Sequence, residues 1–225
     1  MKFFGPLPLS VWILALMFAF VAPVHAERVL ILGDSLSDAY SMPRESGWVY
    51  RLDQRLGCDH ELIDGSISGD TSAGALYRID VLLEQVRPHV LIVILGGNDG
   101  LRGLSPAELE ANLARIIQKG RDAGALTALM QIRLPPNMGP VYIDRFESVY
   151  PRLADRLDVP LLPFFLNDLF DRPGMLMQDG IHPTEQAQPK IVDFMLPHVK
   201  ELIRKAQDQD DLRTSADPSF GKSPD

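Results

Sequence analysis

The chain of 225 residues carries 22 basic and 30 acidic side chains, which give a formal net charge of −8. Excess negative charge opposes contact with a phosphate backbone, so the composition argues against a nucleic-acid partner. Cys58 is the single cysteine of the sequence, which excludes an internal disulfide. The length suffices for one substantial core but not for two ordinary domains.

The first 26 residues have the pattern of a secretory signal peptide. Lys2 precedes an apolar core from Val11 to Val21, and the segment ends in a cleavage pattern of small residues at Ala26. We therefore expect residues 1–26 to be removed and the mature protein to be periplasmic or secreted, without a stable membrane anchor. A retained anchor is the alternative, although the segment is short for a bilayer span and contains Pro23.

Short apolar runs alternate with segments of helical periodicity along the rest of the chain. This alternation predicts an α/β fold, a three-layer α/β/α sandwich with a central five-stranded parallel sheet and right-handed crossovers. In chain order, the expected strands are Val29–Leu32, Glu61–Ile63, Val90–Leu95, Leu126–Ile132 and Val159–Leu162, and the expected helices lie near Gly47–Leu56, Ser72–Val86, Pro106–Ala123 and Asp144–Leu157.

Capping and proline signals locate the ends of two helices. Ser105 and Glu108 form a capping box at the start of the helix near 106–123. The last helix should begin after Thr184, and Pro189 and Pro197 favour a kink or a division into two pieces. We assign residues 27–205 to one folded domain and residues 206–225 to an acidic tail that we expect to be disordered.

Polar residues with catalytic potential lie near both ends of this domain. Ser35 follows the first expected strand, and Asp179 and His182 form an Asp-x-x-His pair in the last loop. A serine hydroxyl becomes an effective nucleophile when an imidazole accepts its proton and a carboxylate orients the imidazole. Ser35, His182 and Asp179 fit these roles, with Asp168 and Asp171 as the next candidates for the acid.

Two further residues are candidates for an oxyanion hole. Gly69 follows the second expected strand, and Asn98 follows the third. Since the carboxyl ends of parallel strands meet at one edge of the sheet, we expect both residues to lie near Ser35. A tetrahedral intermediate needs preorganised donors, which the N–H groups of Ser35 and Gly69 and the side-chain amide of Asn98 can supply.

Simpler interpretations exist for the same residues. Gly-Asp-Ser is a common turn, so Ser35 taken alone could merely cap a junction between strand and helix. Asp34 and Asp99 are expected to accept hydrogen bonds from turn amides. Asp179 and His182 could instead bind a metal with Glu185, but no second cluster of ligands with suitable spacing appears in the sequence.

The order and spacing of these motifs resemble the SGNH, or GDSL, hydrolase family, with a flavodoxin-like sheet. The similarity is closest to its branch of periplasmic acyl-CoA thioesterases, lysophospholipases and arylesterases, and it covers about residues 28–200. It implies Ser35 as nucleophile, Asp179 and His182 as the rest of the triad, and Gly69 and Asn98 in the oxyanion hole. The segments that carry the similarity are Ser66–Ser72, Gly96–Gly103, Met130–Pro135, Val159–Phe165 and Asp179–Pro183.

The resulting expectation is an exported, monomeric serine hydrolase that needs no metal and no other cofactor. Its substrates would be small acyl esters, thioesters or lysophospholipids. Apolar loop residues such as Phe164 and Phe170 either pack against the domain or form a groove for an acyl chain. The alternatives are an O-acetyl esterase that acts on carbohydrate or peptidoglycan, and a catalytically silent module that binds lipid or glycan.

Overall fold

The computed structural model describes residues 26–216. Residues 1–25, which hold nearly all of the predicted signal peptide, and residues 217–225 lie outside the described part. Within that part, none of the helices combines the length and the apolar character needed to cross a bilayer.

Five parallel strands form the central sheet, as predicted. In chain order they are β1 (Glu27–Gly33), β2 (His60–Asp64), β3 (Val90–Ile94), β4 (Leu126–Met130) and β5 (Leu161–Leu162). The spatial order is β2-β1-β3-β4-β5, and every neighbouring pair is parallel. Inner parallel strands are covered on both faces, which explains why β3 is a continuous run of buried apolar residues rather than an alternating pattern.

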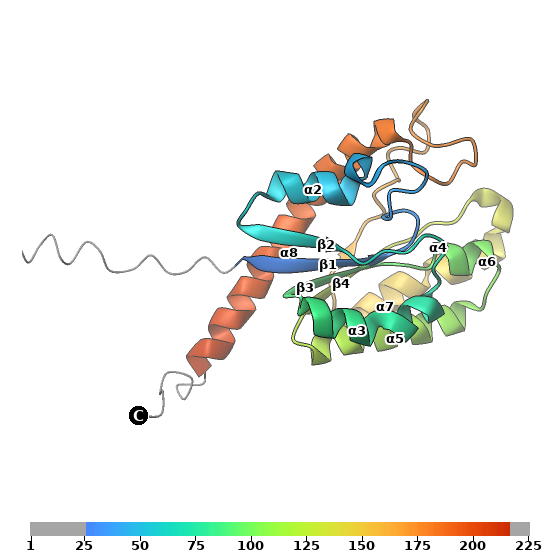
Figure 1. Ribbon diagram of the computed structural model, residues 1–225. Coiled ribbons are helices and arrows are strands. Elements are labelled where there is room, and N and C mark those ends of the chain that lie inside the picture. Colours follow the sequence, from blue (N-terminus) through green and yellow to red (C-terminus); the bar gives the residue numbers. More distant parts are fainter. Residues whose placement is uncertain (1–25, 217–225) are drawn as a thin grey trace, which may run out of the picture.

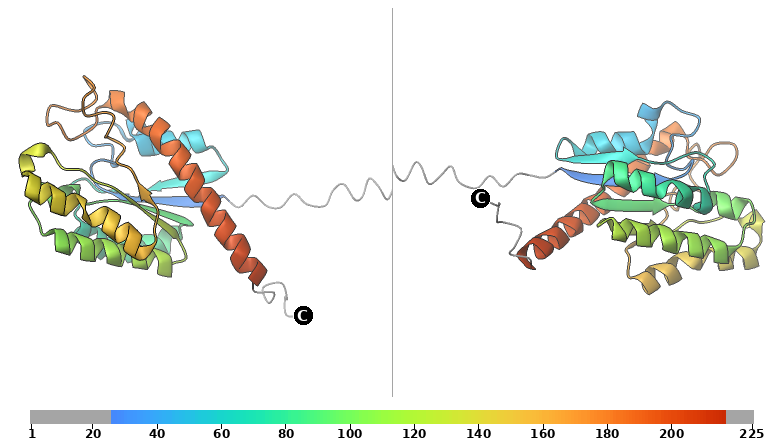
Figure 2. Two further views of the ribbon diagram at one scale, coloured as in Figure 1. Left: turned by 180° about the vertical axis from the view of Figure 1, so that it is seen from behind. Right: turned by 60° about the horizontal axis from the view of Figure 1, so that its bottom comes forward.

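Helices cover both faces of this sheet and complete the predicted three-layer sandwich. The helices α2 (Trp48–Leu56) and α8 (Gln188–Ala216) contact each other on one face (Figure 1). On the other face, α5 (Pro106–Asp122) packs between α3 (Ser72–Val86) and α7 (Val149–Leu157), as the right view of Figure 2 shows. The short elements are α4 (Gly97–Leu101), α6 (Pro140–Glu147) and the 3₁₀ turns Arg44–Ser46, Pro136–Met138 and Glu185–Ala187.

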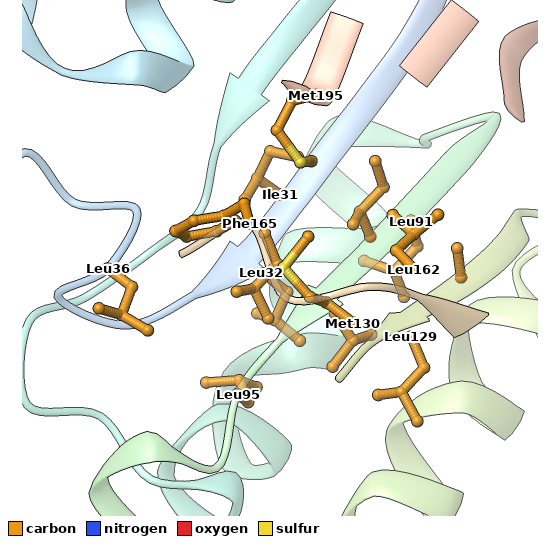
Figure 3. Packing of buried hydrophobic residues seen from close by; sticks show 14 of the residues in the cluster. Ile31, Leu32, Leu36, Leu91, Leu95, Leu129, Met130, Leu162, Phe165 and Met195 are labelled. Carbon is orange, nitrogen blue, oxygen red and sulfur yellow. The ribbon is translucent and has the colours of Figure 1, made fainter. Parts of the chain in front are cut away.

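The apolar core includes side chains from the sheet, from α8 and from the loop after β5. Figure 3 shows Met195 of α8 and Phe165 of that loop beside Ile31 and Leu32 of β1. All four side chains are at most 3% exposed. The loop after β5 is therefore anchored in the core by Phe165, which helps to hold the segment that follows.

The predicted helix over 144–157 is in fact two helices. α6 ends at Glu147, and α7 begins at Val149 after Ser148. Pro151 supplies the physical reason, because its ring lacks an N–H and opposes the carbonyl of the residue four positions earlier, which is Glu147.

The end of the chain also differs from expectation. α8 is one helix that contains Pro197 and continues to Ala216, so residues 206–216 are helical where disorder was expected. Ala206 is 4% exposed in the core, and Arg204 forms an ion pair with Asp208 one turn later. Such i,i+4 pairs favour a helix in an otherwise polar segment. At the start of α5, Ser105 is the N-cap as predicted, but its side chain makes no capping hydrogen bond.

The sheet order brings three loops together. Because β1 lies between β2 and β3, the loops that follow these three strands are neighbours at the carboxyl edge of the sheet. The loop after β5, residues 163–184, reaches the same edge and contacts the loop after β1 through His182 and Ser35. This edge holds the polar residues singled out in the sequence.

Candidate active site

Ser35, His182 and Asp179 form a continuous chain of hydrogen bonds. The Oγ atom of Ser35 lies 2.8 Å from Nε2 of His182, and Nδ1 of His182 lies 2.7 Å from Oδ2 of Asp179. The other oxygen of Asp179 accepts hydrogen bonds from the backbone N–H groups of Ile181 and His182, at 2.9 and 3.0 Å. An imidazole held in this way can accept the serine proton, because the carboxylate fixes its orientation.

The charged form of Asp179 is favoured by these hydrogen bonds. Partial burial opposes the carboxylate, but the bonds from the ring and backbone of His182 and from the backbone of Ile181 outweigh it, so the pKa of Asp179 lies below its usual value. The loop itself is closed by backbone hydrogen bonds from Met177 N–H to the His182 carbonyl (2.8 Å) and from Thr184 N–H to the Met175 carbonyl (2.8 Å). Asp179 is thus available as an anion beside the imidazole.

Ser35 is positioned by the turn that follows β1. The carbonyl of Asp34 accepts hydrogen bonds from the N–H groups of Ser37 and Asp38, at 3.0 and 3.1 Å, so the chain turns directly after the strand. The indole of Trp48 donates to the carbonyl of Leu36 at 3.0 Å and ties this turn to α2. Within residues 26–216, the N–H of Ser35 donates no hydrogen bond and remains available to a ligand.

Asn98 lies in the first turn of α4. Gly96 precedes this helix with φ +118°, and a side chain there would meet the hydroxyl of the buried Tyr150. The Nδ2 atom of Asn98 donates to Oδ2 of Asp34 at 3.2 Å. Because a carboxylate only accepts hydrogen bonds, this contact fixes which end of the Asn98 amide is the donor and leaves its second N–H for another acceptor.

Gly69 lies in the loop between β2 and α3. It has φ +80°, a conformation that favours glycine, and its carbonyl accepts a hydrogen bond from Arg102 at 2.8 Å. Its N–H donates no hydrogen bond within the described residues. However, Gly69 is not among the residues that line the pocket around Ser35. Its contribution to an oxyanion hole therefore remains a prediction.

The loops that carry Gly69 and Asn98 are joined by a buried carboxylate. Asp99 is 4% exposed, and its two oxygens accept hydrogen bonds from the backbone N–H and the hydroxyl of Ser72, at 2.8 and 2.5 Å. Ser72 is the first residue of α3, three positions after Gly69. As predicted, Asp99 binds a backbone amide, but the amide belongs to another loop, so the contact couples two loops rather than stabilising one.

A mostly apolar pocket opens beside these groups. Its empty volume, including the open mouth, is about 540 Å³. Ser35, Asn98 and His182 line it together with Leu101, Ile132, Leu134, Phe164, Leu166 and Phe170. The apolar loop residues thus divide: Phe164 and Phe170 line the pocket, whereas Phe165 packs against Trp48 in the core.

The position of Glu185 does not support the alternative of a metal site formed with Asp179 and His182. Glu185 does not face Asp179 and His182, because its Oε1 atom accepts a hydrogen bond from Ser46 at 2.8 Å and lies 3.6 Å from Arg51. Among the described residues, no group of three or more His, Cys, Asp or Glu side chains could hold a metal ion.

Asp34 is the most perturbed acid of the site. Its side chain is 1% exposed, and burial raises its pKa from the usual 3.8 to about 6, against hydrogen bonds from Leu36 N–H and Asn98 that favour the carboxylate. Since the folded protein then binds this proton more tightly than the unfolded chain, Asp34 makes the fold less stable as the pH rises from about 4 to about 6.

We expect Asp34→Asn to remove this pH dependence. Between pH 4 and pH 7, the difference in free energy of unfolding between variant and wild type should shift by about 2 kcal/mol in favour of the variant. Urea unfolding of both proteins at pH 4, 5.5 and 7 measures the shift. If the difference in free energy of unfolding between variant and wild type stays constant over this range, the pKa of Asp34 is the same in the folded and unfolded chains.

Comparison with known proteins agrees with the geometry. Residues 31–188 match the model of the GDSL-like lipase/acylhydrolase family. The chain is 45% identical over 181 residues to esterase TesA of Pseudomonas aeruginosa, covering 79% of this chain and 90% of the relative. It is 44% identical over 195 residues to an arylesterase of Vibrio mimicus, covering 85% of this chain and 96% of the relative. A similar match, 44% over 178 residues, is thioesterase 1/protease 1/lysophospholipase L1 of Escherichia coli, with 79% and 86% covered.

Solved structures give the same picture. The esterase EstA of a Pseudoalteromonas species, inhibited by monoethylphosphonate, superposes with a TM-score of 0.77 at 40% identity, covering 79% of this chain and 99% of that one. A crystal structure of TesA gives a TM-score of 0.74 at 45% identity, covering 78% and 99%. The fold and the site thus define a hydrolase of esters. The chain belongs to the GDSL-like lipase/acylhydrolase family.

Two contacts at the site were missed by sequence reasoning. Asp34 was expected to bind only a turn amide, which it does through Leu36 N–H at 3.0 Å, but it also holds Asn98. The ring of Tyr40 stacks on the ring of His182. Both contacts join residues more than 60 positions apart, and neither has a local signature in the sequence.

Proposed function

We propose that this chain is an exported serine hydrolase that cleaves carboxylic esters and thioesters of apolar acyl groups through an acyl-enzyme on Ser35. The observation that carries the proposal is the hydrogen-bonded series Ser35, His182 and Asp179 at the mouth of an apolar pocket. Export rests on the signal pattern of residues 1–26.

In this mechanism His182 accepts the proton of Ser35 as its Oγ atom attacks the acyl carbon. The N–H of Ser35, the N–H of Gly69 and the amide of Asn98 stabilise the negative oxygen of the tetrahedral intermediate. His182 then donates the proton to the leaving alcohol or thiol, and an acyl-enzyme remains. Water, activated by His182, attacks this ester and regenerates Ser35. Asp179 orients the imidazole and stabilises its protonated form.

The apolar pocket favours longer acyl groups over acetyl. Burial of each additional CH₂ contributes about 0.8 kcal/mol, so binding energy should rise with chain length until the pocket is filled. An acetyl group is too short to contact all of the apolar lining formed by Leu134, Phe164 and Phe170, so an O-acetyl esterase would not need this lining. The names of the relatives, an arylesterase and a thioesterase/lysophospholipase, support the same class of substrate.

A series of p-nitrophenyl esters from acetate to laurate tests this proposal. We expect kcat/KM to be lowest for acetate and to rise with the acyl chain. Phe170→Ala should flatten the rise and leave acetate nearly unchanged, because Phe170 lines the pocket without belonging to the triad. Tyr77→Ala is the matched control, since it removes a 91% exposed aromatic ring from α3. A preference for acetate in the wild type would contradict the proposal and favour the O-acetyl esterase.

A further inference from the structure

Tyr40 makes an unusual contact with the imidazole of the site. Its ring stacks on the ring of His182 with centroids 4.1 Å apart and an angle of 23° between the planes. Hydrogen bonds to Ser35 and Asp179 hold the two edges of the imidazole. The ring of Tyr40 covers one of its faces, which neither hydrogen bond constrains. The side chain of His182 is consequently only 16% exposed although its loop is at the surface.

The backbone on either side of Tyr40 is strained. Ala39 and Ser41 have φ +46° and φ +58°, a region that residues other than glycine rarely adopt. Among residues 26–216, two more non-glycine residues have positive φ, Arg87 and Asp158. Those two follow the ends of α3 and α7, where a left-handed residue commonly terminates a helix. Ala39 and Ser41 cap no helix, and strain of this kind clusters at functional sites.

Contacts that do not involve the Tyr40 ring hold this turn in place. Oδ2 of Asp38 accepts a hydrogen bond from Ser68 N–H at 2.8 Å, and the Ala39 carbonyl accepts one from Met42 N–H at 3.1 Å. Ala39 also packs closely against Gly47. A Cβ atom added to Gly47 would lie only 2.7 Å from the Cβ atom of Ala39. The turn is therefore fixed by its neighbours, and Tyr40 can be replaced without removing what holds it.

We propose that Tyr40 is a positioning residue for His182, presented by the strained turn 39–41. The proposal rests on the proposed function, in which His182 moves a proton to and from Ser35. Once Ser35 Oγ bonds to the acyl carbon, the imidazole must stay aligned to protonate the leaving group. The stacked ring opposes rotation of the imidazole out of the plane shared with Asp179, and its electron-rich face stabilises the imidazolium that forms.

Replacement of the ring tests the proposal directly. We expect Tyr40→Ala to lower kcat by about three- to tenfold with KM within about twofold, because the lost contact acts on the base and not on the substrate. Tyr40→Phe keeps the stacked ring and should retain wild-type kcat. Tyr50→Ala is the matched control: Tyr50 lies on α2 and is 40% exposed, against 39% for Tyr40, and it should retain kcat. Unchanged kcat in Tyr40→Ala, or an equal loss in Tyr40→Phe, would overturn the proposal.

A second variant tests the turn without touching the ring. Ser41→Val places a β-branched side chain at positive φ and should lower kcat as Tyr40→Ala does, whereas Ser41→Gly suits this conformation and should retain it. If the turn acts through Tyr40, the double variant Tyr40→Ala, Ser41→Val should be no slower than Tyr40→Ala alone. Additive losses would overturn this link.

Labelling with a fluorophosphonate separates failure of the inference from failure of the proposed function. The probe phosphonylates a serine whose proton an aligned base removes, so its rate with Tyr40→Ala should fall by about the same factor as kcat. A rate equal to that of the wild type would overturn the role of Tyr40 and leave the function intact. A wild-type protein in which Ser35 stays unlabelled would overturn the proposed function itself.

Discussion

Ser35→Ala is expected to lower kcat by about four to six orders of magnitude, since only substrate binding and the oxyanion donors remain to assist water. The variant should fold normally. Ser35 is only partly buried, and its Oγ atom contacts His182 rather than the core. Initial rates with a p-nitrophenyl ester measure the loss, and thermal unfolding measures the stability.

Ser37→Ala is the matched control for that experiment. It lies two positions further along the same turn, is 1% exposed, and its hydroxyl has no hydrogen-bond partner among the described residues. Removal of this hydroxyl should leave kcat at the wild-type level. If Ser35→Ala keeps appreciable activity, or if both variants lose it equally, the nucleophile is not Ser35.

Asn98→Ala should cost about 10²- to 10³-fold in kcat with little change in KM, as expected when one donor to a developing oxyanion is lost. The reason lies in the contact with Asp34, which orients the Asn98 amide before substrate arrives. Steady-state kinetics at saturating ester distinguish kcat from KM.

Asn112→Ala is a suitable comparison for Asn98→Ala. The amide of Asn112 donates to the Ser72 hydroxyl at 3.1 Å, on the network that joins α3 to Asp99 and outside the pocket. Its loss should reduce stability more than kcat. A change in KM alone for Asn98→Ala would identify Asn98 as a substrate-binding residue and contradict its place in the oxyanion hole.

The sheet, and the meeting of Ser35, Asp179 and His182, could be predicted because each has a local signature. Strands such as β3 are buried on both faces, so the apolar run from Val90 onward identifies them without knowledge of their neighbours. Ser35, Asp179 and His182 lie in short motifs whose residue types match one reaction. Parallel topology then brings the ends of separate strands to one edge, which is enough to predict that distant motifs meet.

Other features depend on contacts that no local pattern encodes. The stack of Tyr40 on His182 requires a turn with two left-handed residues, Ala39 and Ser41. A glycine at either position would have indicated this conformation in the sequence, but alanine and serine do not. The course of the Gly69 loop depends on a contact from Arg102, 33 positions later, which donates to the Gly69 carbonyl. The helical course of residues 206–216 depends on docking of Ala206 and on ion pairs along the helix.

The distribution of the site along the chain has a consequence for biosynthesis. Ser35 follows the first strand, whereas His182 lies 147 positions later, beyond the last strand. A nascent chain that ends before the loop after β5 carries Ser35 and Asn98 but not His182. Under the proposed mechanism, hydrolysis would therefore begin only after the final segment has docked on the completed sheet. A chain that leaves its compartment of synthesis unfolded would be inert toward the esters it meets on the way.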